Sequence, residues 1–174
     1  MLLFDLIEIN KLKRAVVYVF FLIISMWLQT MIFARISFFG AKVMFIPIVV
    51  ASIAAMEGGV WGVAFGVAAG LALDMSTLSS TVLFLVLCAI IGFGCGVLMD
   101  YYLNRRFVSF LILSAIVCVL TAICQIIPVW IFKGARLGDL VPIAALQAVL
   151  SVPFAVPAYF AAKRIAVIGT NPRG

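Results

Sequence analysis

Long apolar runs separated by short polar segments make up almost the whole sequence. A helix needs about 20 apolar residues to cross the hydrocarbon core of a bilayer. We therefore place transmembrane helices at approximately residues 15–33, 37–56, 58–73, 81–99, 107–132 and 140–162 of a single domain, residues 1–174. The pattern predicts an all-α polytopic membrane protein, a bundle of about six transmembrane helices.

The second and third runs are the shortest, and the boundary between them depends on Glu57. A continuous helix through this position would bury a carboxylate in lipid, at a cost of about 2.5–3.5 kcal/mol. The segment Glu57-Gly58-Gly59 is therefore predicted to form a turn. A five-span arrangement and a re-entrant pair of short helices remain open alternatives.

The two ends of the chain give weaker signals. Residues 1–10 mix apolar positions with Asp5 and Glu8, which favours an interfacial helix and an unstructured start about equally. The first long run exceeds a signal-peptide core and no small-residue cleavage site follows it, so it is interpreted as a retained anchor. The last run carries Pro142, Pro153 and Pro157, which are expected to kink it.

Composition supports a membrane protein. Hydrophobic residues make up 67% of the chain and charged residues 10%, against about 45–50% and 25% in soluble domains. The net charge of +6 comes from basic residues that flank the apolar runs. We interpret them as topology signals and lipid contacts, and we expect no nucleic-acid partner.

The distribution of basic residues predicts the orientation, because cytoplasmic segments are enriched in Lys and Arg. With the N-terminus inside, eight basic residues lie on inner segments: Lys11, Lys13, Arg14, Arg105, Arg106, Lys163, Arg164 and Arg173. Four lie on outer loops: Arg35, Lys42, Lys133 and Arg136. This excess places both termini in the cytoplasm.

A regular glycine repeat occupies the third run, where Gly58, Gly62, Gly66 and Gly70 recur every four residues. On a helix this spacing forms a nearly continuous groove without side chains. Helices in lipid associate by close backbone packing through small residues. The groove therefore predicts tight contact with another helix, either in this chain or in another protein.

The repeat has a second copy. Gly66-x-x-x-Gly70-x-x-x-Asp74 is matched by Gly92-x-x-x-Gly96-x-x-x-Asp100. A carboxylate at a helix C-terminus opposes the helix dipole, so each aspartate is expected to have a compensating partner. Arg105 or Arg106 is near enough in sequence to serve Asp100, and the hydroxyls that follow Asp74 are its nearest candidates.

These patterns define the candidate site residues. The helix-packing or partner interface comprises Gly58, Gly62, Gly66, Gly70, Gly92 and Gly96. The polar loop contacts are Asp74, Asp100, Arg105 and Arg106. The sequence has no histidine and six acidic residues, and its four cysteines lie inside apolar runs. We therefore expect no catalytic residue, metal or cofactor.

Four segments resemble one family. They are residues 27–30 (Trp-Leu-Gln-Thr), 45–47 (Phe-Ile-Pro), 57–62 (Glu-Gly-Gly-Val-Trp-Gly) and 66–74 (Gly-Val-Ala-Ala-Gly-Leu-Ala-Leu-Asp). This arrangement resembles the MreD family, the small integral-membrane subunit of the bacterial rod-shape machinery. In that family a Leu-Gln pair ends the first helix, a proline opens the second, and a glycine-spaced third helix ends in Gly-Leu-x-x-Asp. Many members place a glycine a few residues after that aspartate, which residues 75–80 lack.

The resemblance implies a non-enzymatic scaffold in the bacterial cytoplasmic membrane. It would link MreC, MreB filaments, the peptidoglycan polymerase RodA and its transpeptidase partner, without a small-molecule substrate. The glycine face would dock a partner's transmembrane helix, or hold the bundle rigid so that its loops can bind.

A second interpretation comes from the fold, because MreD-like chains are similar to the substrate-capture subunits of energy-coupling-factor vitamin transporters. Those subunits carry an Ala-x-x-x-Ala motif in the first helix. Here the first run has no such pair, and Ala51-x-x-x-Ala55 lies in the second run instead. A substrate-capture subunit is the alternative function.

Overall fold

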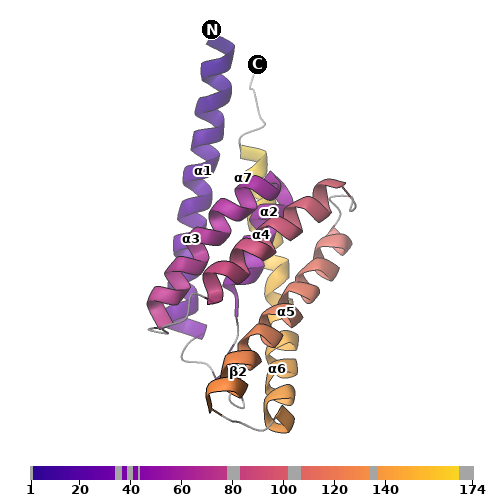
Figure 1. The fold of residues 1–174 in the computed structure, drawn as a ribbon. Helices are drawn as coiled ribbons and strands as arrows, with labels where there is room; N and C mark the ends of the chain where they lie inside the picture. The colour runs from indigo at the N-terminus through magenta and orange to yellow at the C-terminus, as the bar shows by residue number, and fades with distance from the viewer. Residues whose placement is uncertain are drawn as a thin grey trace.

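The protein is seen in a computed structural model. The structure describes the backbone of residues 2–33, 37–38, 41–42, 44–77, 83–101, 107–133 and 137–168, and the side chains of residues 13–31, 44–75, 83–101, 107–126, 138 and 141–167. Figure 1 shows a helical bundle in which α1 begins and α7 ends at the same end of the molecule. This is the arrangement that an even number of alternating helical segments produces.

The described elements are, in chain order, α1 (Leu2–Leu28), the π-helical turn η1 (Gln29–Phe33), β1 (Ser37–Phe38), β2 (Ala41–Lys42), α2 (Ile46–Glu57), α3 (Gly59–Thr77), α4 (Leu83–Tyr101), α5 (Phe107–Lys133), α6 (Leu137–Ser151), the 3-10 turn η2 (Val152–Phe154) and α7 (Ala155–Ile168). The two strands form a short antiparallel pair with Ser37 opposite Lys42.

Four helical segments of the described chain are long and apolar enough to cross a membrane: Lys13–Met31, Leu83–Tyr101, Phe107–Ile126 and Val141–Val167. The helices Ile46–Glu57 and Gly59–Met75 are shorter. The predicted all-helical membrane bundle is therefore confirmed, and four of its six expected spans meet the length that a crossing requires.

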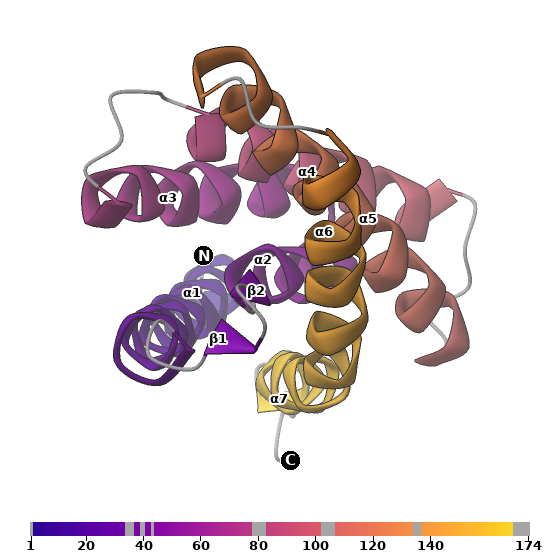
Figure 2. The same cartoon turned by 90° about the horizontal axis from the view of Figure 1, so that it is seen from below.

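The helix α2 forms the centre of the bundle. Every residue from Ile46 to Ala55 is buried, and Figure 2 shows α2 surrounded by other helices when the bundle is seen end-on. A helix that is apolar on all sides belongs in a core. Its 12 residues rise about 18 Å, which is less than the roughly 30 Å of a bilayer core. Its burial by protein explains how so short an apolar helix is accommodated.

The predicted start of this helix at residue 37 is wrong. Residues 37–38 and 41–42 are strands, and α2 begins at Ile46. Pro47 lies in the first turn of α2, where its missing N–H is harmless and its fixed φ suits a helix start. The apolar stretch before it misled the prediction, because hydrophobicity alone does not distinguish a helix from short strands.

Gln29 connects the end of the first helix to the start of the second. Its Oε1 accepts a hydrogen bond of 2.8 Å from the backbone N–H of Phe45, the N-cap residue of α2. Phe45 itself is buried. A buried N–H without an acceptor is costly, so this amide fixes how the chain enters the central helix.

Replacing Gln29 with leucine is expected to destabilise the protein by about 1–3 kcal/mol, because the buried Phe45 N–H would lose the Gln29 acceptor. The measurement is the thermal midpoint of unfolding in detergent micelles. Thr30→Val is the matched control, since the exposed Thr30 hydroxyl donates only to the carbonyl of Met26 in its own helix. Equal midpoints for the two variants would show that Gln29 has no such role.

The predicted turn at Glu57 is confirmed. Gly58 separates α2 from α3 and has φ of +94°, a conformation that favours glycine. Its N–H donates to the Ala54 carbonyl, and its own carbonyl accepts from the Gly62 N–H. The helix α3 continues to Thr77 and not to residue 73 as expected, so Asp74 lies within its last turns.

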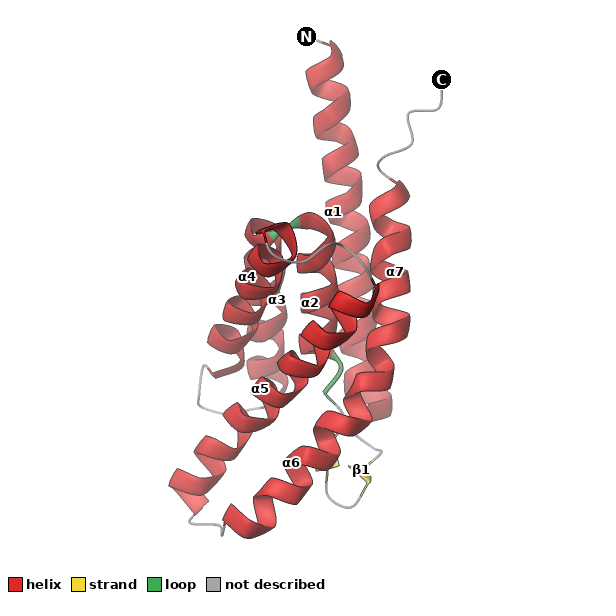
Figure 3. Cartoon of the chain, turned by 90° about the vertical axis from the view of Figure 1, so that its right-hand side faces the viewer, coloured by secondary structure: helices red, strands yellow, loops and turns green. Residues whose placement is uncertain are grey.

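The two ends of the bundle also differ in detail from the expectation. Residues 2–10 are helical and continuous with α1, so they form neither the unstructured start nor the separate interfacial helix that were expected. Figure 3 shows this segment extending past the other helices. At the expected proline kink, the 3-10 turn η2 with Pro153 interrupts the α-helical pattern between α6 and α7, within the continuous helical segment Val141–Val167.

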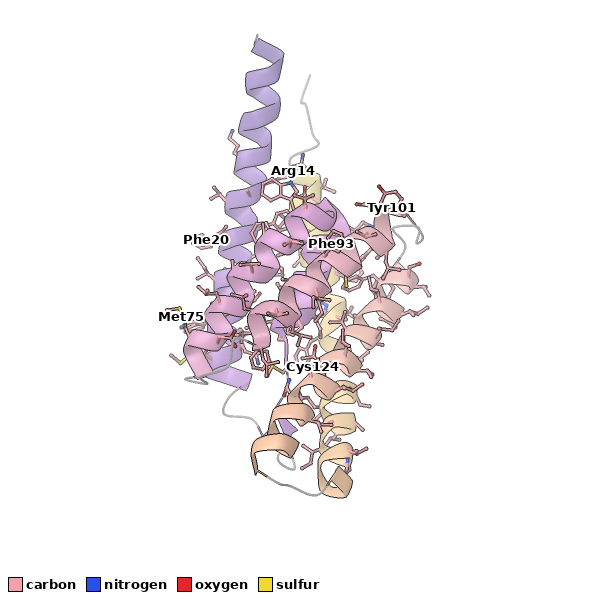
Figure 4. All side chains as sticks on the ribbon, viewed as in Figure 1. Arg14, Phe20, Met75, Phe93, Tyr101 and Cys124 are labelled. Atoms are coloured by element: carbon pink, nitrogen blue, oxygen red, sulfur yellow. The ribbon has the colours of Figure 1, made fainter. Side chains whose placement is uncertain are left out.

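The outer surface of the bundle is apolar. Large hydrophobic side chains are exposed on every long helix, including Phe20 at 64%, Phe93 at 56% and Ile116 at 57%; Figure 4 labels Phe20 and Phe93. Soluble monomers rarely expose contiguous apolar patches of more than a few hundred Å². Lipid is the environment that this surface fits.

Candidate functional site

The helices α3 and α4 form the most extensive helix–helix contact among the described residues. They lie side by side and run in opposite directions (Figure 1). A Cβ atom placed on Gly62 would collide with the carbonyl oxygen of Gly92, and one on Gly92 with the carbonyl oxygen of Gly62. The two backbones therefore touch at this crossing.

The contact extends along both helices. A Cβ on Gly66 would strike the carbonyl oxygen of Cys88, one on Gly70 would lie 2.6 Å from the carbonyl oxygen of Phe84, and one on Gly96 would strike the backbone of Gly59. Real Cβ atoms do not come so close to backbone atoms. Glycine is therefore required at each of these positions for the two helices to approach.

The groove of α3 is filled by α4 of the same chain. The sequence left open whether the groove contacts a helix of this chain or a helix of another protein. In the structure it contacts a helix of this chain. All six candidate glycines, Gly58, Gly62, Gly66, Gly70, Gly92 and Gly96, lie at this contact or at its edge. Another protein's helix cannot occupy the groove while α4 does.

Asp74 binds the start of α4. Its Oδ1 accepts from the backbone N–H of Phe84 at 3.3 Å, and its Oδ2 accepts from the N–H of Leu85 at 3.0 Å. The first N–H groups of a helix have no partner within it, and that end carries a partial positive charge. The N-terminus of α4 is therefore a compensating partner of Asp74. The hydroxyl side chains expected in this role lie outside the described side chains.

Asp100 occupies the equivalent position at the other end of the pair. Its Oδ2 would lie 2.8 Å from a Cβ on Gly58, the residue immediately before α3. The carboxylate is thus beside the positive end of α3. The expected partners Arg105 and Arg106 lie outside the described residues.

The repeated motif therefore has a structural explanation. Because α3 and α4 are antiparallel, the C-terminal end of each lies beside the N-terminal end of the other. Each glycine stripe brings the backbones together, and each aspartate, Asp74 or Asp100, then reaches the first turn of the opposite helix. The pair is held by close packing along its length and by the Asp74 carboxylate at one end, and the Asp100 carboxylate lies beside Gly58 at the other.

Sequence reasoning missed a second polar cluster, which lies where α1, α2 and α3 meet. Arg14 Nη1 donates to Glu57 Oε1 at 3.3 Å, and both side chains are largely buried, at 22% and 17% exposure. Together with Ala15, Tyr18 and Trp61 they line a pocket of about 260 Å³. The sequence could have predicted this ion pair, because antiparallel packing of the first and second helices brings residue 14 near residue 57.

A third polar contact joins α5 to α6. Gln147 Nε2 of α6 donates to Gln125 Oε1 of α5 at 3.3 Å. Such interhelical bonds in lipid contribute on the order of 0.6–2 kcal/mol each.

No group of three or more His, Cys, Asp or Glu side chains that could hold a metal occurs among the described residues.

These features define a class: a multi-pass α-helical membrane protein built around a buried central helix and a glycine-packed antiparallel helix pair. Comparisons of the chain with family models, with curated proteins and with solved structures find no match.

Proposed function

We propose that this protein is a non-enzymatic scaffold subunit of the bacterial cell-elongation machinery, similar to the MreD family. In this role it links MreC, MreB filaments and the peptidoglycan synthase formed by RodA and its transpeptidase partner. It resides in the cytoplasmic membrane with both termini in the cytoplasm, the orientation that the excess of basic residues on those segments favours.

The proposal rests on one observation: the residues that resemble the MreD family have structural roles in this bundle. Gln29 binds the Phe45 N–H at the entry to α2, Pro47 lies in the first turn of that helix, and Asp74 binds the start of α4. The resemblance therefore involves the residues that organise this bundle, and not hydropathy alone.

The geometry favours a role in which the rigid bundle binds the membrane helices of partner proteins on its outside. Because α4 fills the glycine groove, the surfaces left for other membrane helices are the exposed apolar faces of the bundle. The extension of α1 beyond the other helices (Figure 3) lies at the end of the bundle where α7 ends. In the proposed orientation this extension faces the cytoplasm, where MreB filaments lie.

The test is depletion of the protein in a rod-shaped host, followed by imaging of the cells. We expect rounding and widening, with rescue by the native gene. Rods of normal width after complete depletion would reject the proposal.

Affinity purification of the tagged full-length protein, followed by mass spectrometry, separates the two functions considered. Recovery of MreC and RodA supports the scaffold. Recovery of an ATP-hydrolysing transport module instead would identify a substrate-capture subunit and overturn the proposal.

A further inference from the structure

The pocket between α1, α2 and α3 combines features of a ligand site. Arg14 and Glu57 supply a cation and an anion, and Tyr18 and Trp61 supply aromatic rings. Tyr18 packs edge-on against Phe65 with ring centroids 6.0 Å apart, and Trp61 stacks on the same ring at 6.1 Å. These ring contacts hold the pocket wall in place. Figure 4 shows Arg14 near the end of the bundle where the termini lie.

Arg14 keeps donor capacity beyond its ion pair. A guanidinium has five N–H donors in a planar fork, and Nη1 is the one that donates to Glu57. The Nε atom is buried and has no hydrogen-bond partner in the described structure. A buried donor without an acceptor is unfavourable. A phosphate oxygen is a suitable acceptor for the Arg14 donors that do not bind Glu57, and the buried Nε becomes available to it when the side chain turns toward the pocket.

The balance of charge in the pocket selects among phosphate-bearing ligands. Glu57 cancels the charge of Arg14, so a purely anionic ligand gains attraction from one residue and repulsion from the other. A zwitterion with a phosphate and an ammonium group gains from both. The exposed ring of Trp61, with 41% of the residue accessible, can also accept an ammonium group over its face.

The surroundings favour a lipid over a soluble ligand. Figure 1 shows α1 and α3 running away from this end of the bundle in the same direction. Large apolar side chains are exposed on both helices, including Phe20, Val67 and Leu71, so this part of the bundle surface suits acyl chains. Arginine and tryptophan are also typical of the level of lipid headgroups.

We propose that this pocket binds the headgroup of an aminophospholipid, such as phosphatidylethanolamine, with its phosphate on Arg14 and its ammonium group near Glu57 and Trp61. The site fixes a lipid against the joint between the anchor helix α1 and the central helix α2. It is independent of which proteins the bundle assembles with.

The experiment is native mass spectrometry of the full-length protein released from nanodiscs that contain equal parts of phosphatidylethanolamine, phosphatidylglycerol and phosphatidylcholine. The native protein is expected to retain phosphatidylethanolamine preferentially. Arg14→Gln is expected to reduce this retention about tenfold, the effect of losing a charge-assisted hydrogen bond. Lys13→Gln is the matched control, because it removes the same charge from the neighbouring exposed residue and should leave retention unchanged.

A double variant and a measurement with soluble ligands distinguish lipid binding from misfolding and from binding of free phosphate. Arg14→Gln alone leaves Glu57 without its partner, so the double variant Arg14→Gln/Glu57→Gln removes both charges and is expected to lose the preference while remaining folded. Thermal unfolding with soluble phosphoethanolamine or inorganic phosphate is expected to show little stabilisation, because neither has acyl chains. Equal retention by the Arg14→Gln and Lys13→Gln variants would overturn the proposal. So would a preference for phosphatidylglycerol, or stabilisation by inorganic phosphate as large as that by the lipid.

Discussion

Replacing Gly92 with alanine is expected to destabilise the protein strongly, whereas Gly94→Ala on the same helix should be neutral or slightly stabilising. A methyl group on Gly92 would collide with the carbonyl oxygen of Gly62, and one on Gly94 would meet nothing within 4 Å. Overpacking a tight contact costs about 1–3 kcal/mol and occasionally more. We expect the upper end or beyond, because a backbone carbonyl in a helix cannot rotate away as a side chain can.

The matched control makes this prediction specific. Alanine is favoured over glycine in a helix by about 1 kcal/mol, so both variants share that gain and differ only in the collision. The measurement is the free energy of unfolding in micelles for the two variants in parallel. Comparable values would contradict direct backbone contact between α3 and α4.

A double variant refines the test. Gly62→Ala and Gly92→Ala both place a methyl group in the same crossing, so once one has separated the helices the second costs less. We expect the destabilisation of Gly62→Ala/Gly92→Ala to be smaller than the sum of the single effects, as is usual for residues in contact. If the proposed scaffold function is correct, the same variants should also lose co-purification with MreC.

The sequence predicted much of the helical pattern because a bilayer enforces it. Every backbone polar group in lipid must be satisfied within a helix or by a neighbouring element, so long apolar runs and polar breaks largely define the helices. The expected helix 107–132 matches α5 (Phe107–Lys133), and the turn at Gly58 follows from the cost of placing Glu57 in lipid.

Contacts between helices were harder to predict, because several arrangements satisfy the same hydropathy. The spacing of Gly62, Gly66 and Gly70 indicates a close neighbour but does not say which helix it is. The role of α2 was hidden for a related reason: its apolar surface suits lipid and protein equally, and only its short length distinguishes the two. Arg14 and Glu57 are distant in sequence and meet only when three helices have packed.

The two aspartates show how a local rule led to an incomplete answer. A carboxylate at the C-terminal end of its own helix is unfavourable, which directed attention to nearby cations and hydroxyls. The same group lies at the favourable N-terminal end of the antiparallel neighbour. The sign of the dipole interaction therefore depends on which helix is considered, and this could be known only after the pairing of α3 with α4.

Replacing Asp74 with alanine is expected to destabilise the protein by about 2 kcal/mol. Losing an N-terminal cap costs roughly 0.5–2 kcal/mol, and the N–H groups of Phe84 and Leu85 would both lose a charged acceptor. Asp74→Asn should cost less, because it keeps one acceptor oxygen and loses mainly the charge–dipole interaction, about 0.3–1 kcal/mol.

Hydrogen exchange at individual amides locates this effect, since the exchange of an amide reports the stability of its own hydrogen bond. The amide of Leu85 should exchange fastest in Asp74→Ala, at an intermediate rate in Asp74→Asn and slowest in the native protein. Met75→Ala is the control, because that side chain is 75% exposed next to Asp74 and should leave these amides unchanged. An unaltered Leu85 rate in Asp74→Ala would mean that the carboxylate does not cap α4. Faster exchange throughout α4, by contrast, would mean that this one contact holds the whole helix pair together.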